Sequence, residues 1–256
     1  MNYKNTLIIL TILAFSLSYY GCHKLVMLDG NHHQISEKRQ LVPFTKVVNE
    51  GSFNVYIIQD TISEAIVEAE SNLVPYIRTI VNGETLIIDT RESINSNIPI
   101  NVYVRTPEIN SIKLSGSGTM STDSLTGDNV EIKISGSGNI NANVDAGILN
   151  ATISGSGDMW INAVAETTYT KISGSGNINL SGYSNDGDFN ITGSGKIQAY
   201  EFTMESLEAN ISGSGNMYLY VMQYLQVKIS GSGSVYYMGN PSLDVSITGS
   251  GSVNHQ

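Results

Sequence analysis

Ile134-Ser135-Gly136-Ser137-Gly138-Asn139-Ile140 is one copy of a pattern that recurs eight times along the chain. Each copy holds the tetrapeptide (Ser/Thr)-Gly-Ser-Gly, and successive copies begin 18 to 20 residues apart. A fixed period of this length is typical of architectures in which similar units stack on one another. The tetrapeptides begin at Ser115, Ser135, Ser154, Ser173, Thr192, Ser212, Ser230 and Thr248.

The residues around each tetrapeptide alternate as they would on a strand. The residue before it is always Leu or Ile, and the residue five places after its first Ser or Thr is Met, Ile or Val. These positions share their parity with the two glycines, so all of them would lie on one face of an extended segment. We expect this face to point inward, the serines to point outward, and the chain to bend at the glycines, where a side chain would collide with packed backbone.

This pattern predicts an all-β protein, a right-handed parallel β-helix (solenoid) with about 19 residues per coil. Equivalent residues of successive coils would then lie roughly 4.8 Å apart. The unbroken period predicts a single β-helical domain over residues 41–256, with the eight glycine-motif coils at 111–256.

Residues 41–110 lack the motif but contain strand patterns. Apolar residues alternate in 53–57, 65–69 and 98–104, and Asn82-Gly83 is typical of a tight turn. We expect these residues to form irregular N-terminal coils that cap one end of the solenoid, because unprotected strand edges promote aggregation.

The N-terminus predicts export and a lipid anchor. Residues 1–21 have the features of a lipoprotein-type signal peptide, with Lys4, an apolar run over 7–17, and Gly21 directly before Cys22. Cys22 is the single cysteine, and we expect it to be lipidated and to attach the protein to a membrane. The alternative is ordinary cleavage near Ser18. Residues 22–40 would form a flexible tether, and the protein would be exported to the bacterial cell envelope, anchored in the outer membrane.

Several segments together resemble a known bacterial family, the putative auto-transporter adhesin "head GIN" domain. The resemblance implies an exported, all-β, β-helical envelope protein, often lipid-anchored. We expect a non-catalytic protein that presents an adhesive or a structural surface. It covers about residues 41–256 and is carried by the segments 42–47, 53–59, 83–88, 104–107 and 112–118, and by repeats such as 136–140.

The composition excludes several kinds of function. The net charge is −10 and no basic run occurs in the body of the chain, which argues against nucleic acid as a partner. We expect no enzymatic activity, cofactor or metal, because all four histidines lie outside the repeats and Asp158 is the single carboxylate directly after the eight motifs. These histidines are His23, His32, His33 and His255.

A carbohydrate-binding or carbohydrate-active module is the alternative. β-Helical polysaccharide-degrading enzymes need acidic side chains that face one groove. Asp188 and Glu208 occupy the same outward position in successive coils and are the residues on which such an activity would depend.

Aromatic residues gather on one predicted flank. Positions six and eight after the first motif residue point outward, and they hold the only Trp together with several Tyr beside amides. Amphipathic rings of this kind suit a glycan or protein ligand, although stacked Tyr rings can also simply stabilise a sheet. The sequence leaves a homo-oligomer open. The predicted binding residues are Trp160, Tyr200, Tyr218, Tyr220 and Tyr236.

Overall fold

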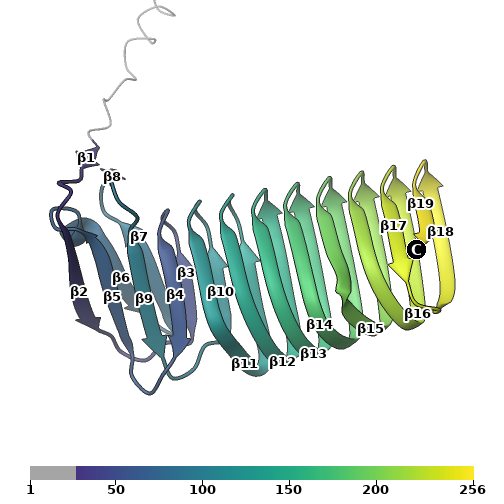
Figure 1. Ribbon diagram of the computed structural model, residues 1–256, viewed down its shortest axis with the longest axis horizontal. Helices are drawn as coiled ribbons and strands as arrows, with labels where there is room; N and C mark the ends of the chain where they lie inside the picture. Colours follow the sequence, from purple (N-terminus) through teal and green to yellow (C-terminus); the bar gives the residue numbers. More distant parts are fainter. Residues whose placement is uncertain (1–26) are drawn as a thin grey trace, which may run out of the picture.

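The computed structural model describes residues 27–256, so the predicted signal peptide and Cys22 lie outside the described residues. The described chain forms one row of stacked coils, with its N-terminal strands at one end and β18 (Ser242–Gly249) at the other (Figure 1). No helix within residues 27–256 is both long and apolar enough to cross a membrane.

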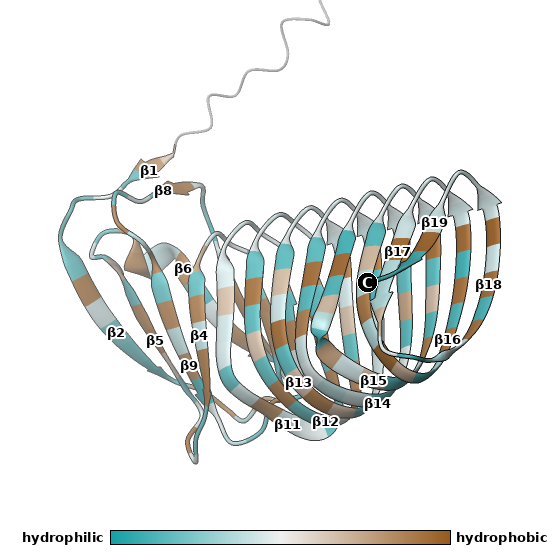
Figure 2. Ribbon diagram, turned by 45° about the vertical axis from the view of Figure 1, so that its right-hand side comes forward, coloured by the Kyte–Doolittle hydropathy of each residue, from teal (hydrophilic) through white to brown (hydrophobic). Residues whose placement is uncertain are grey.

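The glycine-motif repeats form parallel strands, one per coil, as the sequence predicts. Each strand starts directly after one motif and runs into the next, and its neighbours pair in register, as in Ile140 with Met159 and Met159 with Ile178. Each coil is a flattened loop that curves gently on one side and turns sharply through the motif on the other (Figure 2). These strands are β11 (Thr119–Ile134), β12 (Asn139–Gly155), β13 (Asp158–Gly174), β14 (Asn177–Gly193), β15 (Lys196–Gly213) and β16 (Asn216–Gly231).

The core is built from the predicted apolar positions. The residue before the motif is buried in seven coils, from Leu114 to Ile229. The apolar residue five places after the first motif residue is also buried in seven coils, from Met120 to Val235. Apolar and polar residues therefore alternate in bands along the strands (Figure 2). Because each band stacks on the same band of the next coil, the stability of one coil depends on its neighbours.

The two glycines of the motif are required by the close approach of successive coils. Gly174, a first motif glycine, has a φ of 139°, and a Cβ there would collide with the carbonyl oxygen of Gly155 in the preceding coil. That oxygen accepts a hydrogen bond from the Ser175 N–H at 3.0 Å. At Gly176, a second motif glycine, a Cβ would meet the carbonyl of Gly157 and the side chain of Ile153. The first glycine thus prevents a clash between coils, and the second also leaves room for the core.

The predicted N-terminal strands are present. They include β4 (Asn54–Gln59), β5 (Glu64–Glu70) and β9 (Asn101–Thr106). Gly83 has a φ of 59° and turns the chain between β6 (Ile77–Asn82) and β7 (Thr85–Thr90), which pair antiparallel. The predicted strands at 53–57 and 65–69 and the predicted turn are therefore confirmed, and the strand predicted at 98–104 begins at Asn101.

The N-terminal coils do not stack in chain order. The coil made of β3 (Lys46–Asn49) and β4 lies between the coil of β7 and β9 and the coil of β10 (Ser111–Leu114) and β11. The chain therefore forms the coil of β3 and β4 first. It then forms the coil of β7 and β9 on the N-terminal side of that coil, and the coil of β10 and β11 on the other side. Both strands of the inserted coil gain a parallel partner on each side.

Antiparallel strands close the N-terminal end. β5 pairs antiparallel with β9, and β2 (Gln34–Gln40) pairs antiparallel with β5. A 3-10 helix at Val74–Tyr76 connects β5 to β6, and the Arg39 guanidinium donates hydrogen bonds to the carbonyls of Ile77 and Val74. Residues 34–40 therefore form a strand and not the predicted tether, because each of them pairs with a residue of β5.

The preceding segment is also held to this cap. β1 (Leu28–Asp29) pairs with β8 (Ile94–Asn95), and the buried Glu70 carboxylate accepts hydrogen bonds from the His32 N–H and from Asn97. Burial alone would raise the pKa of Glu70, but hydrogen bonds from the Asn97 side chain, the His32 and Asn97 N–H groups and Ser96 lower it to about 2. The carboxylate thus ties the residues before β2 to the loop around β8.

Candidate binding surface

The position-six residues of the predicted aromatic flank form one column in the structure. Trp160 lies between Asn141 and Asn179 in the strand register, and Tyr218 lies between Gln198 and Tyr236. The column therefore has an Asn–Trp–Asn segment in the middle of the solenoid and a Tyr segment towards its C-terminal end.

The Tyr segment is a ring stack that is half-buried. The Tyr218 and Tyr236 ring centroids are 5.2 Å apart with an interplanar angle of 10°, and Tyr200 meets Tyr218 edge-on at 5.6 Å. Burial raises the pKa of Tyr200, and the neighbouring Tyr218 and Tyr236 raise it further. Pairs of this kind contribute about 0.5–1.5 kcal/mol beyond their buried area. The stack therefore stabilises the sheet, which is the alternative role that the sequence leaves open for these rings.

Tyr200 does not lie in the column that its position in the repeat predicts. Between β14 and β15, Asn179 pairs with Gln198 but Ser181 pairs with Glu201, so β15 has one extra residue there. In the next pair of strands, Tyr220 of β16 pairs with Thr203 of β15. Residues 200–202 thus form a bulge, in keeping with the 20-residue interval between Thr192 and Ser212. The bulge brings Tyr200 beside Tyr218 and presents the exposed Glu201 side chain to the central part of the flank.

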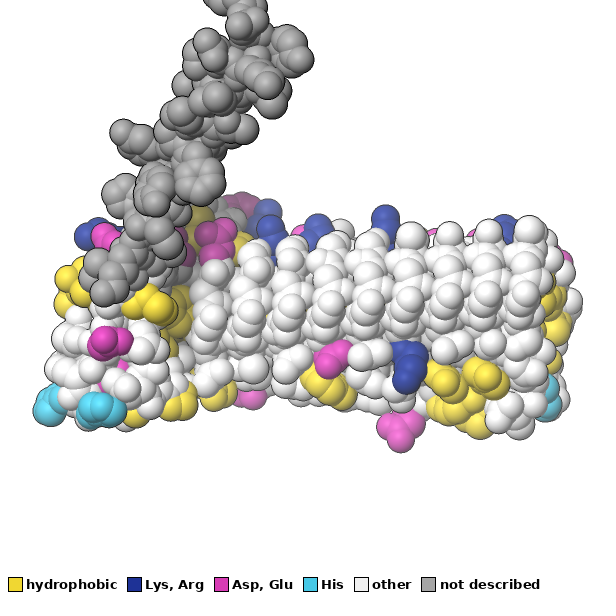
Figure 3. Space-filling view, turned by 90° about the horizontal axis from the view of Figure 1, so that it is seen from above, with side chains coloured by type: hydrophobic (Ala, Val, Ile, Leu, Met, Phe, Trp, Pro, Cys, Tyr) yellow, Lys and Arg dark blue, Asp and Glu magenta, His cyan; other side chains and the backbone are white. Residues whose placement is uncertain are grey.

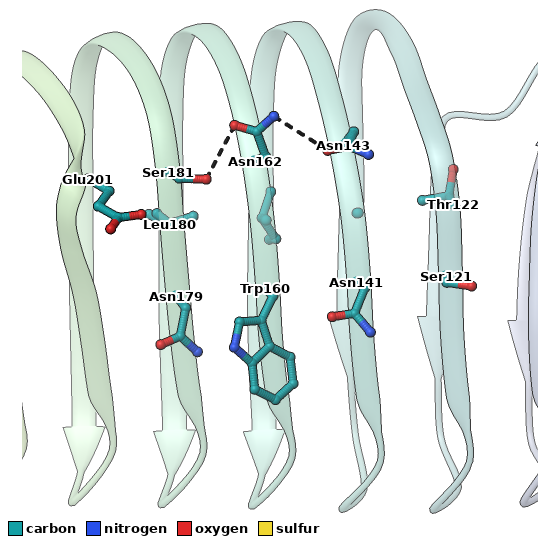
Figure 4. A pocket seen from close by; sticks show the side chains of 12 residues that line it. Ser121, Thr122, Asn141, Asn143, Trp160, Asn162, Asn179, Leu180, Ser181 and Glu201 are labelled. Atoms are coloured by element: carbon teal, nitrogen blue, oxygen red, sulfur yellow. Dashed lines mark hydrogen bonds between the residues drawn. The ribbon is translucent and has the colours of Figure 1, made fainter.

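Trp160 stands in a surface depression of about 350 Å³. Its side chain is 44% exposed. Figure 4 shows the indole between Asn141 and Asn179, with a second row formed by Asn143, Asn162 and Ser181 and with Glu201 at one side. We call this site the Trp160 depression; its lining side chains are Ser121, Thr122, Asn141, Ala142, Asn143, Trp160, Ile161, Asn162, Asn179, Leu180, Ser181 and Glu201.

The amides of the second row hold one another in place. Ser181 donates a hydrogen bond to Asn162 Oδ1 at 3.2 Å, and Asn162 donates to Asn143 Oδ1 at 3.4 Å. In the first row Asn179 donates to the Met159 carbonyl at 3.2 Å. The Asn141 amide forms no hydrogen bond with the residues that the structure describes, and it is exposed. The depression therefore offers an exposed ring with the free amide of Asn141 beside it.

The carboxylates of the enzyme alternative do lie in neighbouring coils, as the sequence predicts. Asp188 of β14 pairs in register with Glu208 of β15, and a second depression around them includes Tyr169 and Tyr224. Asp188 accepts a hydrogen bond from the Asn190 amide at 2.7 Å. These residues lie near the far ends of their strands, apart from the Trp160 depression.

The histidines within the described residues lie apart from both depressions. His32 and His33 lie in the turn before β2, and the His255 ring packs against Tyr237 with a centroid distance of 5.0 Å. Over residues 27–256 the side chains of His, Cys, Asp and Glu form no group of three arranged to hold a metal ion.

The sequence pattern placed amides beside the aromatic rings of this surface, but only the rings were predicted as binding residues. Asn141, Asn143, Asn162 and Asn179 occupy positions six and eight of their coils, so the alternation that selects Trp160 also places them on its face. Glu201 was not accessible to such reasoning, because it reaches the depression only through the bulge.

The fold is shared with solved structures of bacterial proteins. A putative lipid binding protein from Parabacteroides distasonis is 26% identical, covers 90% of this chain and 99% of its own, and superposes with a TM-score of 0.84. A putative adhesin from the same organism is 25% identical over 90% of this chain and 100% of its own, with a TM-score of 0.87. A putative adhesin from Parabacteroides merdae is 22% identical over 90% and 99% of the two chains, with a TM-score of 0.86, and shows the fold alone.

The sequence comparisons agree with these structures. No curated protein matches the sequence. The profile of one family matches residues 43–177 and, in a second overlapping alignment, residues 153–241. Together the two alignments span the N-terminal cap and most of the glycine-motif coils, so the chain belongs to the family described as "Putative auto-transporter adhesin, head GIN domain".

Proposed function

We propose that this protein is a non-catalytic adhesin of the bacterial envelope that binds neutral glycans at the Trp160 depression. Membership of an auto-transporter adhesin family supports export to the envelope. A lipid anchor on Cys22 would hold the protein at the membrane, with the solenoid projecting from it.

The exposed Trp160 ring is the observation that carries the choice of ligand. A flat indole face packs well against the C–H face of a sugar ring, and amides beside it can pair with the hydroxyl groups. Asn141 and Asn179 lie on either side of the ring, one coil away each, which is roughly 4.8 Å. We favour a glycan over a lipid because amides and hydroxyl groups line this depression.

A neutral ligand fits the charges at the site. Glu201 is the only charged side chain that lines the depression, and the nearby Asp123 contributes its carbonyl to Asn143. An anionic glycan would approach a chain of net charge −10 against repulsion. We therefore expect hydroxyl-rich, uncharged sugars to bind best.

Glycan binding by the purified full chain tests the proposal. Trp160→Ala should weaken binding by roughly tenfold or more, as is common for a central aromatic contact. Asn141→Ala should weaken it less. Tyr169→Ala removes another exposed ring near the opposite end of β13 and should leave binding unchanged. If Trp160→Ala binds glycans as well as the parent chain does, the depression is not the site.

A carbohydrate-active function is the second candidate, and the register of Asp188 and Glu208 favours it. Coils are roughly 4.8 Å apart, which is close to the separation of about 5–5.5 Å between the carboxyl groups of retaining glycosidases. A screen of bacterial and plant glycans for degradation decides between the two. Turnover that disappears in Asp188→Asn would replace the adhesin proposal, whereas intact glycans support it.

A further inference from the structure

The last coil of the structure has an open edge. β17 (Ser234–Met238) and β18 (Ser242–Gly249) form the last complete coil, and β19 (Ser252–His255) stacks on β17, so β18 and β19 lie at the edge. Within the described residues, β18 pairs with β16 alone and β19 with β17 alone, so the backbone groups on their outer sides have no strand partner. We call the outer side of β18 and β19 the open end.

The open end leaves core positions uncovered. Leu243, Val245 and Ile247 are 43%, 39% and 40% exposed. Their partners one coil earlier, Leu225, Val227 and Ile229, have the same side-chain types and are buried. The apolar stripe of the solenoid thus reaches the surface here, and hydrophobic side chains are visible at this end of the molecule in Figure 3. A flat, apolar edge strand of this kind pairs readily with another strand.

The opposite end of the molecule cannot serve as the partner. There the antiparallel strands β2 and β5 cover the coils, and β2 carries Glu37, Lys38 and Arg39 on the edge. Charged side chains on an edge strand discourage further pairing. Stacking of the open end of one molecule on the capped end of another is therefore disfavoured, and with it the growth of a filament.

The sequence of β18 is complementary to itself when two copies run antiparallel. If the pairing centres on Val245, Leu243 of one copy faces Ile247 of the other and Val245 faces Val245, so inward residues meet inward residues. Asp244 then faces Ser246, and the two carboxylates do not oppose each other. Residues 234–256 contain one acidic side chain, Asp244, and no Lys or Arg, so little of the net charge of −10 lies at this end.

We propose that two copies of this chain associate through their open ends, with β18 paired antiparallel to β18 around a two-fold axis near Val245. The pairing covers the exposed apolar column in both copies and joins the two solenoid cores. The N-terminal caps then lie at the two far ends of the dimer, since they are opposite β18 in each molecule (Figure 1). If the N-termini are anchored as in the proposed function, the dimer would connect two membrane surfaces.

The oligomeric state of the full chain tests this inference. Cys22→Ala is used throughout so that no acyl chain drives association. Light scattering after gel filtration should give twice the monomer mass of 27.6 kDa. Val245→Lys places two like charges at the two-fold axis and should give monomers. Ser246→Lys, on the same strand, would place a Lys beside Asp244 of the partner copy and should keep the dimer. A monomeric parent chain, or a Val245→Lys chain that stays dimeric, overturns the inference.

Cross-linking checks the register without relying on a disrupted variant. Antiparallel partners have Cα atoms about 4.5–5.5 Å apart, within the range that a disulfide spans. Val245→Cys in the Cys22→Ala chain should therefore form a covalent dimer under mild oxidation, whereas Ser36→Cys on β2 should not. Cross-linking through Ser36→Cys alone would place the contact at the capped end and refute the proposal. We expect monomeric Val245→Lys to retain glycan binding, so failure of the dimer and failure of the glycan site at Trp160 can be distinguished.

Discussion

Substituting one glycine of the motif tests how the coils are held together. Gly174→Ala would force an L-residue to a φ of 139° and place its Cβ against the Gly155 carbonyl. Backbone strain of this kind costs about 1–3 kcal/mol. Shifting the coils to relieve the collision costs about 1–3 kcal/mol more, as in overpacked cores. We therefore expect Gly174→Ala to lower the free energy of unfolding by about 2–6 kcal/mol.

Three other glycines separate the two causes. Gly176→Ala meets the Gly157 carbonyl and Ile153 but has no positive φ, so we expect a loss of about 1–3 kcal/mol. Gly83 has a φ of 59° and nothing within 4 Å of the added Cβ, so Gly83→Ala isolates the strain, at about 1–2 kcal/mol. Gly127 has neither feature, and Gly127→Ala should change stability by less than about 1 kcal/mol.

Urea denaturation of the four variants in the Cys22→Ala chain measures these differences, and hydrogen exchange locates them. Repeat arrays can lose cooperativity, so the fitted free energy alone is insufficient. Gly174→Ala should reduce amide protection in β13 and β14, including the Ser175 N–H that donates to Gly155. If Gly174→Ala is no less stable than Gly127→Ala, the close approach of the coils does not explain why glycine recurs in the motif.

Three further predictions concern the cap, the Tyr stack and the anchor. The folded-state pKa of Glu70 lies below its ordinary value of 4.5, so the stability that its ionised carboxylate contributes is present above pH 4.5 and is lost as the pH falls towards about 2. The melting temperature should therefore decrease between pH 4.5 and about 2. Glu70→Gln should lower the melting temperature at pH 7 and make its decrease in acid smaller. Tyr218→Ala should lower the free energy of unfolding by about 1–3 kcal/mol because it removes two ring contacts, whereas Tyr218→Phe should cost less than about 1 kcal/mol in the same urea assay. Labelled palmitate should be incorporated into the parent chain and not into Cys22→Ala; equal incorporation would exclude this anchor.

The period of the motif was sufficient to predict the solenoid. A repeated unit has copies of itself as neighbours, so its own residues reveal both what it contacts and which face it buries. The parity of Ile134, Gly136 and Ile140 therefore predicted the inward face, and the burial of Ile134 and Ile140 confirms it. The N-terminal strands were likewise predictable as strands, because alternation is a local property.

The N-terminal arrangement was decided by tertiary structure. The insertion of the β3–β4 coil between two later coils depends on pairing between segments far apart in the chain, and no local pattern encodes it. β2 was predicted as part of a tether because its residues are mostly polar, yet its partner β5 makes it an edge strand. A strand that lies at an edge needs few apolar residues, so its sequence resembles that of a linker.

The candidate site combines both kinds of information. Alternation in a single coil placed Trp160 on the outer face, and the repeat length placed Tyr218 and Tyr236 in its column. The bulge at residues 200–202 moved Tyr200 out of its expected place and brought Glu201 to the Trp160 depression. A sequence period shows that an extra residue is present, but the packing of the whole coil determines where the chain accommodates it, and only the folded chain shows which side chains then become neighbours.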